Sequence, residues 1–114
     1  MLVYVALSHP AEQINLFAEN AIKFVISMGH TPICPMLMLG NLDISRSEGK
    51  DLIFKTCKDI IGTCDEFWVF GDRYELASFE EKKLAISNNK KIVRITSLHM
   101  RSGVMPKELE ECHF

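Results

Sequence analysis

The sequence lacks the short motifs that mark the commonest cofactor and nucleophile sites. It contains no G-x-G-x-x-G after its first apolar segment, no Walker A motif, no G-x-S-x-G and no H-E-x-x-H. A sheet that binds a dinucleotide needs a glycine-rich first loop, because the pyrophosphate must approach the backbone closely. A tightly held nicotinamide dinucleotide is therefore disfavoured, and we expect neither a cofactor nor a metal ion.

Long hydrophobic runs and an excess of positive charge are lacking as well. The first ten residues hold only a short apolar run without a basic segment, which is too little for a signal peptide or a membrane span. The formal net charge is -2, and the basic residues are scattered apart from Lys82-Lys83 and Lys90-Lys91. We therefore expect a cytoplasmic protein that binds neither nucleic acid nor a membrane.

Cysteine pairs of the C-x-x-C type are also absent. The four cysteines are Cys34, Cys57, Cys64 and Cys112. The first three lie in apolar segments, where a reduced cysteine behaves as a small hydrophobic residue. We predict that these three are buried free thiols.

Apolar segments with two different periods alternate in the first half of the chain. The continuous run Leu2–Leu7 is typical of a strand that is covered on both faces. Residues 14–28 repeat apolar side chains at helical spacing, and Gly29 supplies a residue that can end the helix in a left-handed conformation. A brief strand at 31–35 is bounded by prolines and leads into a loop at 36–44.

The second half continues this alternation. A helix begins at a capping box formed by Ser45 and Glu48 and ends at Gly62. The later elements are a strand at 66–70, a helix from about 76 to 89, a strand at 91–96, and one candidate short helix after Pro106 in a tail without a strong period.

This order of elements predicts an α/β fold. Strands that alternate with helices form a parallel sheet with right-handed crossovers, so we expect a Rossmann-like (flavodoxin-like) three-layer sandwich with four or five strands. The length suits one domain over residues 1–114. Ligands bind such sheets beyond the carboxyl ends of the strands. The candidate substrate-binding residues are Ser8, His9, Pro10, Gly71, Asp72 and Ser78.

Glu81 combines a charged side chain with an inward position. A helical projection puts it on one stripe with Ala77 and Ala85. Two interpretations stay open, because Ser78 and Glu81 also have capping-box spacing and a glutamate in the first turn is stabilised by the helix dipole. Tyr4 could direct its hydroxyl to the same end of the sheet, although a buried tyrosine with one satisfied hydroxyl explains that residue equally well.

Several segments together carry a family resemblance. They are Tyr4–Ala6, Ala21–Gly29 with Pro32 and Pro35, Arg46, Cys64–Gly71 and Glu81–Ala85. Their order and spacing resemble the nucleoside 2-deoxyribosyltransferase-like superfamily, especially its small bacterial and phage members, over residues 1 to about 96.

The resemblance implies roles for particular residues. Glu81 matches the nucleophile that attacks C1′ of a deoxyribonucleoside, and Tyr4 matches the tyrosine that orients it. The resulting glycosyl ester would be opened by a second base or by water, as in retaining glycoside hydrolysis. Glu75 is a candidate for the acid that protonates the base. Superfamily members commonly pair so that one subunit closes the other's site, which implies a homodimer or a higher homo-oligomer.

The chain also departs from the family pattern. Ala77 and Phe79 stand where characterised transferases usually have glycines, and Cys57 stands where the family has an aspartate. Two functions therefore stay open. One is N-glycosidic bond chemistry on a nucleoside or nucleotide, as a deoxyribosyltransferase or hydrolase. The other is a non-catalytic domain that binds a nucleotide-derived ligand, or a phage or prophage accessory domain that binds a host partner.

Overall fold

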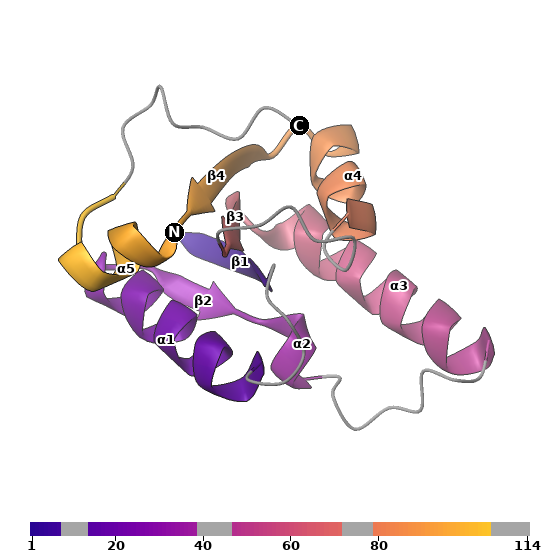
Figure 1. Cartoon of the computed structure of the whole chain (residues 1–114). Helices are drawn as coiled ribbons and strands as arrows, with labels where there is room; N and C mark the ends of the chain where they lie inside the picture. Colours follow the sequence, from indigo (N-terminus) through magenta and orange to yellow (C-terminus); the bar gives the residue numbers. More distant parts are fainter. Residues whose placement is uncertain (8–13, 39–46, 72–78, 106–114) are drawn as a thin grey trace.

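Parallel strands form the centre of the computed structural model, which describes residues 1–7, 14–38, 47–71 and 79–105. The strands are Leu2–Leu7 (β1), Thr31–Ile33 (β2), Glu66–Phe70 (β3) and Lys91–Ile95 (β4), in the order β2-β1-β3-β4 (Figure 1). Val5 pairs with Trp68 and all three strand pairs are parallel, as predicted. This order is that of flavodoxin-like sheets.

Helices cover both faces of this sheet. Helix α1 (Ile14–Ser27) and helix α5 (Ser97–Ser102) lie against one face, whereas α3 (Ser47–Thr63) and α4 (Phe79–Ser87) lie against the other (Figure 1). The predicted three-layer α/β sandwich is therefore confirmed. Within the described ranges, no helix is both long enough and apolar enough to cross a membrane.

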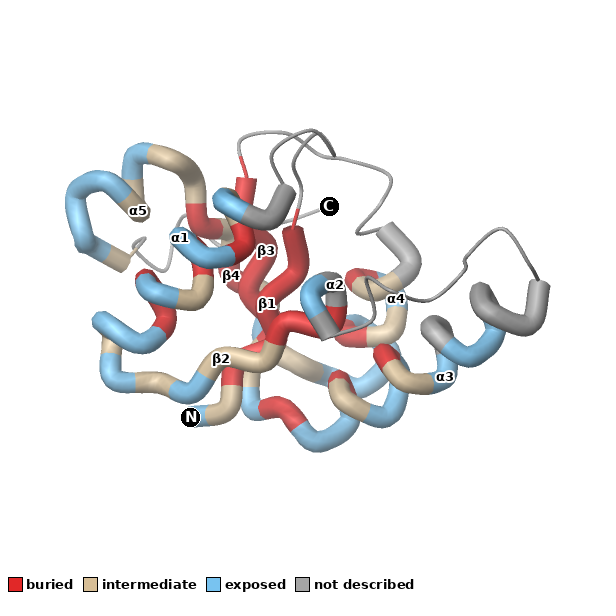
Figure 2. Tube along the Cα trace, turned by 90° about the horizontal axis from the view of Figure 1, so that it is seen from below, coloured by how far each residue is buried: buried red, intermediate tan, exposed pale blue. Residues whose placement is uncertain are grey.

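The side chains of the strands alternate between two separate cores. Because successive residues of a strand point to opposite faces, β1 sends Val3, Val5 and Leu7 toward α1 and sends Tyr4 and Ala6 toward α3 and α4. Strand β3 divides in the same way, and its buried residues lie at the centre of the molecule (Figure 2). The continuous apolar run of β1 thus reflects burial on both faces.

The cysteines of the described ranges lie in the interior of the protein. Cys34, Cys57 and Cys64 are buried free thiols, as predicted. Burial raises the pKa of the Cys64 thiol to about 11, which keeps it protonated at neutral pH. Cys112 lies outside the described residues.

The ends of the two long helices differ in how well the sequence predicts them. Gly29 ends α1 in the expected left-handed conformation, with φ at 85°, and the N–H of His30 bonds the carbonyl of Val25 at 3.2 Å. Helix α3 instead continues through Gly62 to Thr63. The N–H of Cys64 still bonds the carbonyl of Ile60 at 3.1 Å, so Gly62 lies in the last turn and is not its end.

The second strand is shorter than the 31–35 segment that the sequence predicts. Strand β2 ends at Ile33, and Pro35–Met38 forms a short helix, α2, where we expected the end of a strand and a loop. Proline suits the first position of a helix because the N–H that it lacks would have no partner there. The N–H of Leu37 closes this turn on the carbonyl of Cys34 at 3.2 Å.

Helix α5 lies in a region for which the sequence predicted no regular structure. Thr96, expected as a strand residue, is the N-cap of this helix and forms a reciprocal capping box with His99. Histidine replaces the glutamate or glutamine that marks this motif in a sequence, which explains why the pattern was missed. Gly103 ends the helix with φ at 67°. The expected helix after Pro106 lies outside the described residues.

The two-core arrangement predicts different effects for two substitutions in one helix. Ile61 of α3 is fully buried, whereas Leu52 of the same helix is 52% exposed. Ile61→Ala should lower the free energy of unfolding by about 2–5 kcal/mol, because it leaves a cavity. Leu52→Ala should change it by less than about 0.5 kcal/mol. Urea denaturation followed by the fluorescence of Trp68, the single tryptophan, measures both; equal losses would contradict the arrangement.

Candidate active site

Tyr4 and Glu81 meet on the face of the sheet that α3 and α4 cover. Strand β1 directs Tyr4 to this face, and Glu81 lies in the first turn of α4. The hydroxyl of Tyr4 donates a hydrogen bond to Oε2 of Glu81 across 77 residues of sequence. The structure therefore brings together the two residues that the family resemblance pairs.

The position of the Tyr4 hydroxyl is set by tight packing around its ring. Tyr4 is fully buried and stacks on Phe67 of β3, with ring centroids 5.0 Å apart and an interplanar angle of 18°. A stacked, buried ring on a central strand has little rotational freedom. The hydroxyl is thus held at one place relative to α4.

Burial changes the protonation equilibrium of Glu81. Desolvation raises the pKa of its carboxyl, whereas the hydrogen bond from Tyr4 lowers it. The first turn of a helix also favours the negative charge. A carboxylate at this point is therefore more basic than an ordinary surface glutamate.

Tyr4 itself remains a hydrogen-bond donor. Its pKa is raised, first by burial and then by the charge of Glu81, so the phenol stays protonated throughout the physiological range. The interaction between the two residues is accordingly a phenol donating to a carboxylate.

Cys57 of α3 is the third polar group at this site. Burial raises the pKa of its thiol, the hydrogen bond with Tyr4 lowers it, and the charge of Glu81 raises it. A buried thiol with a raised pKa is neutral at pH 7. Cys57 occupies the position at which the family resemblance predicts a carboxylate, so this cluster carries one carboxylate fewer than that pattern.

The other predicted site residues fall into two groups. Gly71 lies at the carboxyl end of β3 with φ at 138°, a conformation that favours glycine, and its N–H bonds the carbonyl of Ile95 at 3.0 Å. That N–H is therefore engaged by the protein. The remaining predicted residues lie outside the described ranges: Ser8, His9, Pro10, Asp72, Glu75 and Ser78.

Lys82 is a buried charged residue that the helical projection missed. It is 5% exposed and follows Glu81 in α4. One feature of the sequence does indicate this burial. Lys82 lies three residues before the buried Ala85, which puts it beside the inward stripe of the helix. Within the described ranges, no group of three or more histidine, cysteine or acidic side chains is suited to hold a metal ion.

Comparison with known proteins identifies the fold. No family model matches the sequence, and neither does any curated protein. Among solved structures, a 2-deoxyribosyltransferase from Bacillus psychrosaccharolyticus superposes with a TM-score of 0.68, covering 100% of this chain and 93% of that enzyme at 18% identity. The chain has the nucleoside 2-deoxyribosyltransferase-like fold. The CMP N-glycosidase of Clostridium botulinum shares this fold with a TM-score of 0.55 and 18% identity, over 91% of this chain and 83% of that enzyme.

In this 2-deoxyribosyltransferase-like fold, the bond between Tyr4 and Glu81 should be energetically significant. Tyr4→Phe should lower the free energy of unfolding by about 1–3 kcal/mol, because a hydrogen bond to a charged group is lost, and should raise the pKa of Glu81 further. Urea denaturation measures the first effect. The matched control repeats the change in a Glu81→Gln background, and a double-mutant cycle without coupling between the two positions would contradict the bond.

The raised pKa of Glu81 predicts a pH dependence of stability. The folded chain holds the Glu81 proton more tightly than the unfolded chain, whose carboxyl titrates near its ordinary value of 4.5. The contribution of Glu81 to the free energy of unfolding is therefore fully present below the pKa of the unfolded chain. It is lost as the pH rises through the pKa that Glu81 has in the folded chain. Relative to the Glu81→Gln variant, the wild-type chain should gain stability on acidification through this window. A difference in unfolding free energy that stays constant with pH would contradict this expectation.

Proposed function

We propose that the protein cleaves the N-glycosidic bond of a nucleoside or nucleotide, with Glu81 as the nucleophile and Tyr4 as the residue that orients it. The observation that carries this proposal is the hydrogen bond between a fully buried tyrosine and a partly buried carboxylate whose pKa is raised. Raised pKa values with an identifiable cause and partner are a mark of functional sites.

The proposed reaction has two displacement steps. In the first, an oxygen of the Glu81 carboxylate forms a bond to C1′ of the sugar while the bond from C1′ to the base nitrogen breaks. The electron pair goes to the departing base, which takes up a proton. In the second step, water or a second nucleobase attacks C1′ and gives up a proton to the group that protonated the first base, and the ester bond to Glu81 breaks to restore the carboxylate.

The role of Tyr4 follows from the two oxygens of a carboxylate. Its hydroxyl engages Oε2 of Glu81, which leaves Oε1 to act as the attacking atom. The hydrogen bond also stabilises the ionised form of Glu81, the only form with a nucleophilic lone pair and charge. Desolvation acts in the opposite direction on the pKa and makes the ionised carboxylate a stronger nucleophile.

Protonation of the base needs a separate donor. The neutral Cys57 thiol has a raised pKa and is a weak acid for this step. Glu75 is therefore our candidate for the donor. Ser8, His9, Pro10, Asp72 and Ser78 are the candidates for binding the sugar, with or without its phosphate.

Two similar enzymes support a substrate of this class. The 2-deoxyribosyltransferase transfers a deoxyribosyl group, as its name states, and the CMP N-glycosidase acts on a nucleotide. Transfer and hydrolysis differ only in what attacks C1′ in the second step. We propose a cytoplasmic enzyme, active as a homodimer or a higher homo-oligomer.

The decisive substitution is Glu81→Gln. An amide has nearly the shape of the carboxylate but cannot form the glycosyl ester, so base release should fall by roughly 10³-fold or more. The experiment incubates each protein with deoxyribonucleosides, ribonucleosides and their monophosphates, and measures free base by chromatography. Glu19→Gln, at an exposed position of α1, is the matched control and should keep full activity.

Each outcome has a defined meaning. Base release that survives in the Glu81→Gln variant would exclude Glu81 as the nucleophile. No release by the wild-type chain from any substrate would favour the non-catalytic ligand-binding domain. A second base added to the mixture distinguishes transfer, which yields a new nucleoside, from hydrolysis, which yields free sugar.

A further inference from the structure

A groove lies between α1 and α5 on the sheet face opposite Tyr4 and Glu81. Its volume is about 490 Å³, within the range of small-molecule sites. Its lining includes Phe17, Asn20, Lys23 and Phe24 from α1, and Met100 and Arg101 from α5. Nothing in the proposed reaction uses this groove.

The charged residues of this groove have one sign. Lys23 and Arg101 contribute to the lining from different helices, and none of the described lining residues carries a carboxylate. Both are exposed, and neither forms an ion pair within the described part of the chain. Two cations in one concave site, with no acidic partner among the described residues, attract an anion.

The floor of the groove is apolar. Phe24 is 5% exposed, and Phe17 and Met100 are half-buried against the same core. Aromatic and thioether side chains offer a polarisable surface to a flat organic group. Asn20 adds an amide to the lining. A fitting ligand thus has an anionic end and an apolar body.

We propose that this groove binds a small organic phosphate monoester. The phosphate would lie between Lys23 and Arg101, and the apolar body would lie over Phe17 and Met100. A phosphate monoester carries close to two negative charges at neutral pH, which two cations from two helices balance. The planar guanidinium of Arg101 suits two phosphate oxygens at once.

Phenyl phosphate is the first probe, and the amide resonances of the full chain report where it binds. At low ionic strength, it should cause saturable shifts in residues 17–27 and 97–103. Inorganic phosphate lacks the apolar body, and benzyl alcohol lacks the charge, so each should bind at least about tenfold more weakly. Added salt should weaken the binding of phenyl phosphate, because the cations are exposed.

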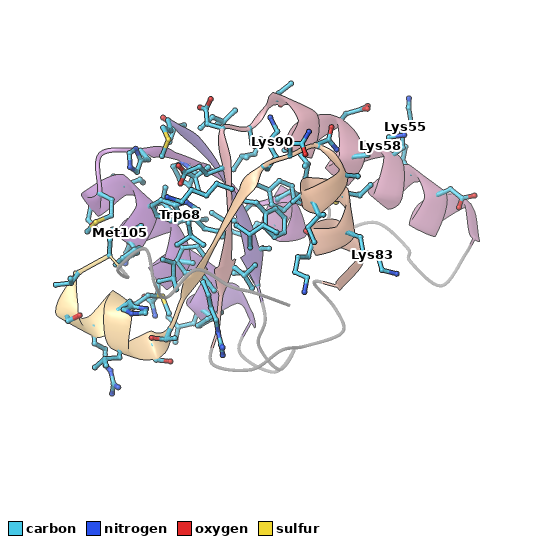
Figure 3. The ribbon with its side chains drawn as sticks, turned by 90° about the horizontal axis from the view of Figure 1, so that it is seen from above. Lys55, Lys58, Trp68, Lys83, Lys90 and Met105 are labelled. Carbon is cyan, nitrogen blue, oxygen red and sulfur yellow. The ribbon has the colours of Figure 1, made fainter. Side chains whose placement is uncertain are left out.

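Substitutions of the two cations test the assignment. Lys23→Gln and Arg101→Gln should each weaken the binding of phenyl phosphate by about fivefold or more, because each removes a charge-assisted hydrogen bond. Both positions are exposed, so the fold should persist, which thermal unfolding verifies. The matched control is Lys58→Gln on α3, on the far side of the sheet from α5 (Figure 3), and it should leave the affinity unchanged.

Three results would overturn the proposal. The first is that α1 and α5 show no saturable shifts up to about 10 mM phenyl phosphate. The second is that the variant with both substitutions binds phenyl phosphate with unchanged affinity. The third is that the shifts are confined to β1 and α4. The last result would assign the probe to the site of Tyr4 and Glu81. Because the two sites lie on opposite faces of the sheet, the Glu81→Gln variant should bind phenyl phosphate in the groove as the wild-type chain does.

Discussion

The burial of β1 on both faces is the constraint on which the rest of the structure depends. This strand lies between β2 and β3 and is covered by α1 on one side and by α3 and α4 on the other. Alternation along the strand divides its side chains between two cores. A shift of register by one residue would move Tyr4 to the α1 face, away from Glu81. The same packing that stabilises the sheet therefore aligns the site.

The hydrogen bond from Tyr4 lowers the free-energy cost of burying the charge of Glu81 but does not cancel that cost. Burial disfavours the charge of Glu81, while the Tyr4 hydroxyl and the first turn of α4 favour it. A purely structural cap would keep its carboxylate near solvent, where the charge costs little. Burial of such a polar cluster lowers the stability of the folded chain. A local loss of stability of this kind is typical of functional sites.

The two faces of the sheet offer different chemistry. The α3 and α4 side holds a neutral thiol, a phenol and a carboxylate in close contact. The α1 and α5 side presents Lys23 and Arg101 over an apolar floor. The first cluster holds the carboxylate that the proposed bond cleavage uses, whereas the second has the charge and the apolar lining that the proposed phosphate site uses. The sheet between them keeps the two sets of residues apart.

The sequence by itself determined the alternation of strands and helices, the parallel sheet and the buried thiols, because hydrophobic periodicity is a local property. Through the family resemblance it also paired Tyr4 with Glu81, without showing a contact between them. Only the tertiary structure decided that they touch, that Cys57 joins them, and that Thr96 and His99 begin a helix. Contacts across 77 residues depend on strand order and on the face to which each side chain points, which no local pattern encodes.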